Sequence, residues 1–242
     1  MRYGIITDIH NNVIALRVVL RQLDQMGCDG IICCGDIIGI GPCPEETVRE
    51  LIHLPGLMSV RGNHEGYLLE GMPAEYPNDE NMSFGEMDHH RWEHALLSDE
   101  SVSFLQGMPK QIKFTVEGLD ISVMHSCMDR NGRFSGSKRN PSEADLRDMF
   151  AGVDSDIILY GHDHDRNICR SDRLYINVGS LGCPAKDRNI ARAGVLTVEN
   201  GKAGIETLDI PYPVDEVIRQ IDRIHYPEAD IIKKIFYGLW TV

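Results

Sequence analysis

The chain has 242 residues, of which 42% are hydrophobic and 25% are charged, a composition typical of a folded, water-soluble protein. This length suffices for a substantial core, so we expect a single domain over residues 1–242. The net charge of −13 argues against stable nucleic-acid binding, which needs a basic surface.

The start of the chain and its cysteines favour a cytoplasmic protein. No apolar stretch is long enough to span a bilayer, which argues against a membrane protein. The opening residues MRYGIITDIH lack the apolar core and the cleavage site of a signal peptide. The seven cysteines include no CxxC pair, which argues against a zinc ribbon or a redox dithiol and favours small buried side chains.

The first 60 residues alternate between strand and helix patterns. Apolar runs predict strands at 3–7, 30–34 and 57–60. Apolar positions at helical spacing predict a helix over 13–26, and Pro44 followed by two glutamates marks the start of another. This order predicts an α/β fold with parallel strands.

Residues 65–108 differ from what precedes them and predict a small helical cap inserted into the domain. Helical patterns cover 83–97 and 99–107. Residues 65–100 hold ten acids and one base, so we expect a solvated, negative surface. A solvated face is also the expected place of the three cap histidines, His89, His90 and His94.

The second half of the chain is rich in strands. They are predicted at 111–117, 120–125, 156–160, 166–170, 174–178, 193–198 and 203–209. One helix is expected over 142–151, and the tail at 214–236 predicts two short helices broken at Pro227. The final residues KKIFYGLWTV leave open two uses, packing on the core or contact with a second subunit in a homo-oligomer.

Metal-ligand residue types follow five of the predicted strands. They are Asp8, His10, Asp36, Asn63, His125, His162 and His164. Because ligands bind beyond the carboxyl ends of strands in α/β sheets, we expect these side chains to converge. We also expect His162 and His164 to face one side, since alternate residues of an extended segment do so.

The chemistry of this set predicts two divalent ions. Four imidazoles, two carboxylates and one amide favour Mn, Fe, Zn, Co or Ni over calcium. Seven ligands are too many for one tetrahedral ion, but they suit two ions, roughly 3.5–4 Å apart, that share a carboxylate. The pattern indicates an open, catalytic centre in which a metal-bridging water of lowered pKa is the nucleophile.

The motifs DIH, GDIIG, GNHE, VMHS and GHDH, in this order and spacing, resemble those of the calcineurin-like metallophosphoesterases. The small prokaryotic, YfcE-like members are more similar still, over about residues 1–210. The resemblance implies a four-layered α/β/β/α sandwich of two mixed sheets. The protein phosphatases of this superfamily carry Asp-Arg where this chain has residues 38–41, Ile-Gly-Ile-Gly, which argues against a protein phosphatase.

The resemblance also implies roles for single residues. The first ion would be held by Asp8, His10, Asp36 and His164. The second ion would be held by Asp36, Asn63, His125 and His162. Asp36 would bridge the two ions and His64 would stabilise the phosphoryl oxygens or protonate the leaving group, so both count as catalytic. Asn63 and His64 would also contact the substrate.

The loop after His125 carries candidates for binding the phosphate group. It would overhang the ions and contains four bases, Arg130, Arg133, Lys138 and Arg139. Arg133 or Arg139 is the candidate phosphate ligand, and a mobile, solvated loop is the alternative. The acidic cap would repel long polyanions, which favours a small phosphorylated substrate.

We therefore expect a dinuclear metal-dependent phosphoesterase. It would hydrolyse a small phosphomonoester or phosphodiester by attack of a metal-bridging hydroxide, without a covalent intermediate. Two alternatives stay open: a non-catalytic metal-binding scaffold of the same fold, and a nuclease.

Overall fold

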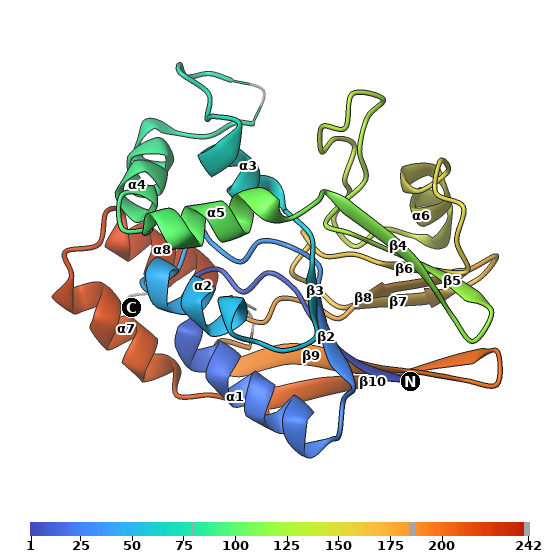
Figure 1. Ribbon diagram of the computed structural model, residues 1–242. Coiled ribbons are helices and arrows are strands. Elements are labelled where there is room, and N and C mark those ends of the chain that lie inside the picture. The colour runs from blue at the N-terminus through green and yellow to red at the C-terminus, as the bar shows by residue number, and fades with distance from the viewer. Residues whose placement is uncertain (79, 184–186, 240–242) are drawn as a thin grey trace.

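The computed structural model describes residues 1–78, 80–183 and 187–239 and contains two five-stranded sheets. The strands are β1 Arg2–Ile6, β2 Gly30–Cys33, β3 Leu57–Ser59, β4 Gln111–Val116, β5 Leu119–Met124, β6 Ile157–Leu159, β7 Asn167–Arg170, β8 Leu174–Asn177, β9 Ile190–Glu199 and β10 Lys202–Pro211. The first sheet has the order β10-β9-β1-β2-β3 and the second the order β4-β5-β6-β8-β7 (Figure 1). Both sheets are mixed, because β9 runs antiparallel to β1 and β4 antiparallel to β5.

The helices are α1 Val13–Gln25, α2 Pro44–Ile52, α3 Asn63–Leu69, α4 Phe84–His94, α5 Asp99–Gly107, α6 Glu143–Met149, α7 Val214–Arg223 and α8 Ala229–Tyr237. The N-terminus of α1 is capped by Asn12, whose side chain accepts a hydrogen bond from the backbone N–H of Ala15. Within the described parts of the chain, every helix is too short or too polar to cross a bilayer.

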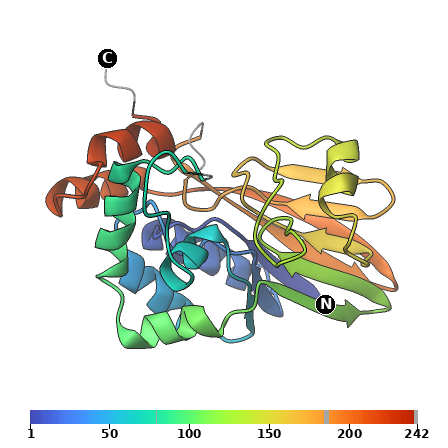
Figure 2. The same cartoon turned by 90° about the horizontal axis from the view of Figure 1, so that it is seen from above.

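Buried side chains join these elements into four layers. Ile5 and Ile32 of the first sheet pack against Val123 and Leu159 of the second, and the dry space between the sheets is their common core. Helices α1, α2, α7 and α8 pack on the outer face of the first sheet. Helix α6 covers the outer face of the second sheet (Figures 1 and 2). The predicted α/β/β/α sandwich is therefore confirmed.

Most predicted elements lie where the sequence pattern puts them, and the differences are local. Strands β9 and β10 are longer than expected, at ten residues each. Helix α3 was not predicted, because its first residues, Asn63 and His64, have the composition of a turn. The tail folds into α7 and α8, which are separated near Pro227 as predicted.

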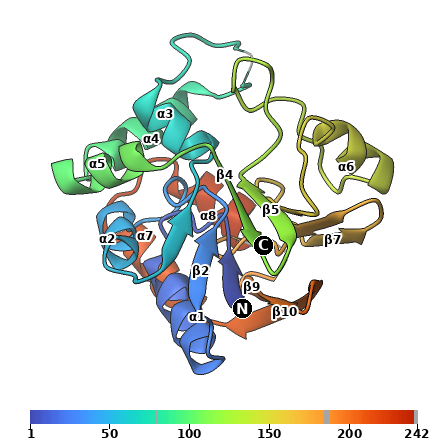
Figure 3. The ribbon, with the colours of Figure 1, turned by 45° about the vertical axis from the view of Figure 1, so that its right-hand side comes forward.

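The carboxyl ends of five strands meet at one edge of the sandwich. Strands β1, β2 and β3 are mutually parallel, as are β5 and β6, so the loops that follow them leave the sheets on one side. These loops cross closely: a Cβ atom at Gly182 would lie 1.8 Å from the carbonyl oxygen of Ile9. Figure 3 shows α3, α4 and α5 on one side of these strand ends and α6 on the other.

Candidate metal centre

The seven predicted ligands gather at this edge in two adjoining groups that share Asp36. In the first group, the Nε2 atoms of His10 and His164 lie 2.9 Å apart. Asp8 Oδ1 lies 3.8 Å from the His10 nitrogen and 3.5 Å from the His164 nitrogen. Two ligands of one ion are separated by roughly 3–3.5 Å when each lies about 2.1 Å from it, so this spacing fits a common ion.

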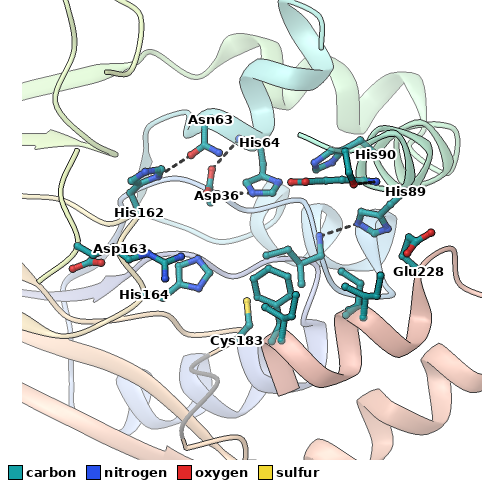
Figure 4. Close-up of a pocket in the computed structure, with 18 of the residues that line it drawn as sticks. Asp36, Asn63, His64, His89, His90, His162, Asp163, His164, Cys183 and Glu228 are labelled. Carbon is teal, nitrogen blue, oxygen red and sulfur yellow. Dashed lines mark hydrogen bonds and ion pairs between the residues drawn. The ribbon is translucent and has the colours of Figure 1, made fainter. Parts of the chain in front are cut away.

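The second group lies on the other side of Asp36. The Oδ2 atom of Asp36 is 3.1 Å from His125 Nε2 and 3.9 Å from His10 Nε2. Asn63 Oδ1 lies 3.0 Å from His162 Nδ1 and 3.1 Å from His125 Nε2 (Figure 4). Asp36 Oδ2 therefore occupies the position between the groups that a bridging ligand would need.

Hydrogen bonds on the far side of the rings suit the histidines for metal binding. His10 Nδ1 bonds to the carbonyl oxygen of Ile38 at 3.2 Å, and His125 Nδ1 to that of Cys34 at 2.8 Å. These bonds orient each ring so that Nε2 faces the centre, as partners of metal-ligating histidines do. Burial and the nearby His164 charge lower the pKa of His10 to about 4, which keeps its ring neutral and able to bind a cation.

Asp36 and His125 shift each other's pKa in opposite directions. Burial alone would lower the pKa of His125, but the charge and the hydrogen bond of Asp36 raise it to about 9. Burial would likewise raise the pKa of Asp36, yet His125 holds it well below its usual range. Each group thus favours the charged form of the other, and a cation held by Asp36 and His125 would take over the role of the His125 proton. The donor set and its spacing fit two divalent transition-metal ions.

Left-handed backbone conformations aim five of these side chains. The φ angles are 52° at Asp8, 50° at His10, 52° at Asp36, 74° at His162 and 60° at His164. Such values are uncommon outside glycine, and they persist only where surrounding contacts enforce them. The expectation that His162 and His164 share a side because their segment is extended is therefore wrong: β6 ends at Leu159, and each histidine is directed by its own turn.

A buried carboxylate, Glu65, holds two of the ligand loops together. Its two oxygens accept four backbone hydrogen bonds, from Asp36, Ile37, Ile38 and Gly62, at 2.7–3.1 Å. Burial and the Asp36 charge raise the pKa of Glu65 to about 7, against the opposing effect of these donors. The GNHE motif contains this residue, but its clamping role was not predicted.

His64 lies next to His10 and Asp36, with its ring centroid 4.9 Å from that of His10. Its Nε2 atom is 3.9 Å from Asp36 Oδ2, and its backbone N–H donates to Asp36 Oδ1 at 3.1 Å. The ring packs flat on Gly39, where a Cβ atom would lie 2.1 Å from Nδ1. Because Gly39 has no side chain, the imidazole of His64 has room to approach the centre.

The cap histidines differ from expectation. His89 and His90 are buried, because α4 packs against the loops that carry the ligands. His90 Nδ1 bonds to Glu93 Oε1 at 2.6 Å, and Glu93 Oε2 accepts from Asn11 and from the backbone of Gly39. The acidic surface expected for residues 65–100 is therefore interrupted by a buried face. The His90 and His64 ring centroids are 5.1 Å apart, so this face borders the centre.

A cavity of about 540 Å³ opens directly over the predicted ligands. Of the two predicted phosphate-binding arginines, both exposed on the same loop, Arg139 lines the cavity and Arg133 does not. Cys183 also lines it and lies close to His10 and His164, although the sequence pattern placed no thiol near the centre. Burial raises the pKa of this thiol well above its usual range.

Comparisons with known proteins identify the family and the fold of the chain. Residues 1–201 match the family model of the calcineurin-like phosphoesterase superfamily domain. An uncharacterised protein of Methanocaldococcus jannaschii is 28% identical over 97% of both chains. The crystal structure of a metallophosphoesterase from Sphaerobacter thermophilus has a TM-score of 0.75 at 22% identity, with 99% of each chain covered. A hypothetical protein from Pyrococcus horikoshii has a TM-score of 0.79 at 16% identity, again with 99% of each chain covered.

Glu65→Gln is expected to destabilise the fold by about 2–4 kcal/mol, because the new amide nitrogen would face two backbone N–H donors with no acceptor between them. Urea unfolding measures this change. Glu70→Gln is the matched control at the end of the same helix: Glu70 is exposed and its ion pairs with Lys110 and Arg61 contribute little. Equal stability of the two variants would contradict the clamp.

His89 is expected to make the fold sensitive to acid. Burial lowers the pKa of His89 to about 4, and its neutral Nε2 accepts a hydrogen bond from the backbone of Ile40. Because the pKa is depressed, this stability is complete above the unfolded value near 6.5 and is lost as the pH falls through about 4. Between pH 7 and pH 5 the loss is about 1–2 kcal/mol.

The His89→Gln variant should show a decline in unfolding free energy between pH 7 and pH 5 that is smaller by this amount. Urea unfolding in metal-free buffer separates the effect from loss of ions. The exposed His53 offers the control, since His53→Gln should keep the wild-type pH dependence. A His89→Gln curve parallel to that of the wild type would refute the assignment.

Proposed function

We propose that this chain, which belongs to the calcineurin-like phosphoesterase superfamily, uses two divalent transition-metal ions to hydrolyse a small phosphomonoester or phosphodiester. The observation that carries the proposal is the position of Asp36 Oδ2, between the His10–His164 pair and the His125–His162–Asn63 group. A scaffold would need no open cavity of about 540 Å³ above such a set.

The chain offers complete ligand sets for both ions. Asp8, His10, Asp36 and His164 would hold the first. Asp36, Asn63, His125 and His162 would hold the second. When bound, such ions supply Lewis acidity toward phosphoryl oxygens and activate a water molecule as the nucleophile. The Thr7 hydroxyl orients the Asp8 carboxylate by donating a hydrogen bond to Oδ2 at 2.6 Å. The Oδ1 atom then faces His10 and His164.

His64 acts on the substrate rather than on the ions in this proposal. Burial lowers its pKa well below the usual range, so the ring is neutral and offers one N–H. From the cavity wall that N–H donates to a phosphoryl oxygen or to the departing alcohol oxygen. Gly39 and Asp36 position the ring: the first gives it room, and the second accepts its backbone N–H.

Arg139 supplies the positive charge that holds the phosphate group. It lines the cavity near Asp163, on whose carboxyl group its charge acts, and no ion pair joins it to a described residue. Its exposed guanidinium can therefore turn toward an anion. The second arginine of the cavity, Arg192, is already paired with Asp187 at 2.7 Å. A single available arginine suits one phosphate group, which supports a small substrate over a nucleic-acid strand.

His64→Ala is expected to lower kcat for p-nitrophenyl phosphate about 10²- to 10³-fold, because it removes a donor that acts in the transition state. The variant should still bind two equivalents of Mn²⁺, counted by metal analysis after gel filtration. His53→Ala, a change on the surface, should leave both values as in the wild type. Undiminished turnover by His64→Ala would remove this residue from the mechanism, and a chelator should abolish wild-type activity reversibly.

Arg139→Ala is expected to raise KM about tenfold with a smaller change in kcat, because it removes a charged contact to the ground-state phosphate. Arg133→Ala, on the same loop, provides the comparison, since Arg133 is exposed like Arg139 but does not line the cavity. Steady-state kinetics with p-nitrophenyl phosphate distinguish the two. A KM effect confined to Arg133→Ala would move the phosphate contact to that residue.

A further inference from the structure

The C-terminal helix α8 forms one wall of the cavity above the predicted metal ligands. Ile231, Ile232, Ile235 and Phe236 all line this cavity. The Phe236 ring lies 6.3 Å from the ring of His164, centroid to centroid, so the wall reaches the floor of the site. In Figure 4 the side chains that project from α8 face the cavity from the side opposite Asn63 and His162.

This wall carries two of the exposed large aliphatic side chains of the molecule. Ile231 and Ile235 are each 51% exposed, on a chain that otherwise exposes few large aliphatic side chains among its described residues. Ile232, at the edge of the cavity, and Tyr237 of the same helix are buried in the core. The helix is thus anchored by one face and presents two isoleucines to the cavity, one helical turn apart.

Helix α8 begins next to α4. A Cβ atom at Gly85 of α4 would lie 2.6 Å from the Glu228 carboxylate, which immediately precedes α8, so the two helices touch where the cavity ends. Both α7 and α8 lie beyond residue 201, the last residue of the family match. The wall therefore lies outside the part of the chain that carries the family motifs.

The charges at the rim restrict what the wall can accept. Apart from Asp36, the cavity is lined by four acids, Glu86, Asp163, Asp165 and Glu228. Two arginines oppose them, Arg139 and Arg192. An occupant with carboxylates or further phosphates next to α8 would meet net negative charge, whereas an uncharged apolar group would lose water against isoleucine and phenylalanine.

We infer that α8 selects the substrate by binding its alcohol portion, and that this portion is an uncharged apolar or aromatic group. The inference rests on the proposed function, because the phosphate group at the ions is what brings this portion against α8. The same cavity contains the predicted ligands and the wall, so one molecule can occupy both. Aryl and similar apolar phosphoesters are preferred over sugar phosphates and polyphosphates.

The test compares two non-hydrolysable probes, phenylphosphonate and methylphosphonate, by calorimetric titration of the Mn²⁺-loaded protein. Removal of roughly 60 Å² of apolar ring surface from water corresponds to about tenfold tighter binding of the phenyl compound. In the Ile231→Asn/Ile235→Asn double variant this ratio should fall to about twofold or less. The exposed positions of both residues make the variant compatible with folding, which circular dichroism and Mn²⁺ stoichiometry check.

The matched control is Ile224→Asn, which changes an exposed isoleucine in the same tail outside the cavity and should retain the wild-type ratio. If the double variant does not fold, Ile231→Ala/Ile235→Ala replaces it, with an expected ratio of about fourfold. A wild-type ratio near one, or an unchanged ratio in the folded double variant, would overturn the inference. So would light scattering that shows a dimer dissociated by the double variant while the ratio stays unchanged, because α8 would then be a subunit contact.

Hydrolysis of phenyl phosphate separates this inference from the proposed function. Tenfold selectivity between the phosphonates without any hydrolysis would support substrate selection by α8 and contradict the proposed phosphoesterase activity. Hydrolysis together with a ratio near one would support the phosphoesterase and contradict the wall.

Discussion

The arrangement of the centre depends on one buried carboxylate, that of Glu65, which ties the turn after β2 to the turn after β3. Asp36 lies in the first turn, and Asn63 and His64 begin α3 directly after the second. The bridging position, one proposed ligand and the proposed hydrogen-bond donor to the substrate therefore share a single support. Four backbone N–H groups from the two turns donate to this one buried side chain. The loops are thereby held close enough for Asp36 to reach both groups of ligands.

This support matters because the backbone of the site is under strain. Five predicted ligands have φ angles in the left-handed region, and each such residue costs of order 1 kcal/mol or more. The cost is offset by packing between two complete sheets and by the interlocked loops around Gly182 and Gly39. A flexible site of the same composition would lose affinity, since each ion would have to order its own ligands.

Much of the centre could be predicted from the sequence, because each ligand immediately follows an apolar strand and strand ends of parallel neighbours must meet. The α/β class and most element positions followed from the same patterns, whereas the four-layered sandwich was implied by the resemblance to the calcineurin-like metallophosphoesterases. The buried face of α4 could not be predicted: the charge of residues 65–100 indicates solvent, and only tertiary packing places His90 and Glu93 inside. The clamp of Glu65 and the placement of α8 likewise depend on contacts between segments distant along the chain.

The proposed ligands come from both sheets: Asp8, His10, Asp36 and Asn63 follow strands of the first, and His125, His162 and His164 follow strands of the second. Neither sheet alone holds a complete set. During synthesis the first 100 residues would leave the ribosome with only part of each coordination sphere, so stable metallation must wait until His164 has emerged and the second sheet has docked. Ion loading would then act as a checkpoint that reports completed assembly of the sandwich.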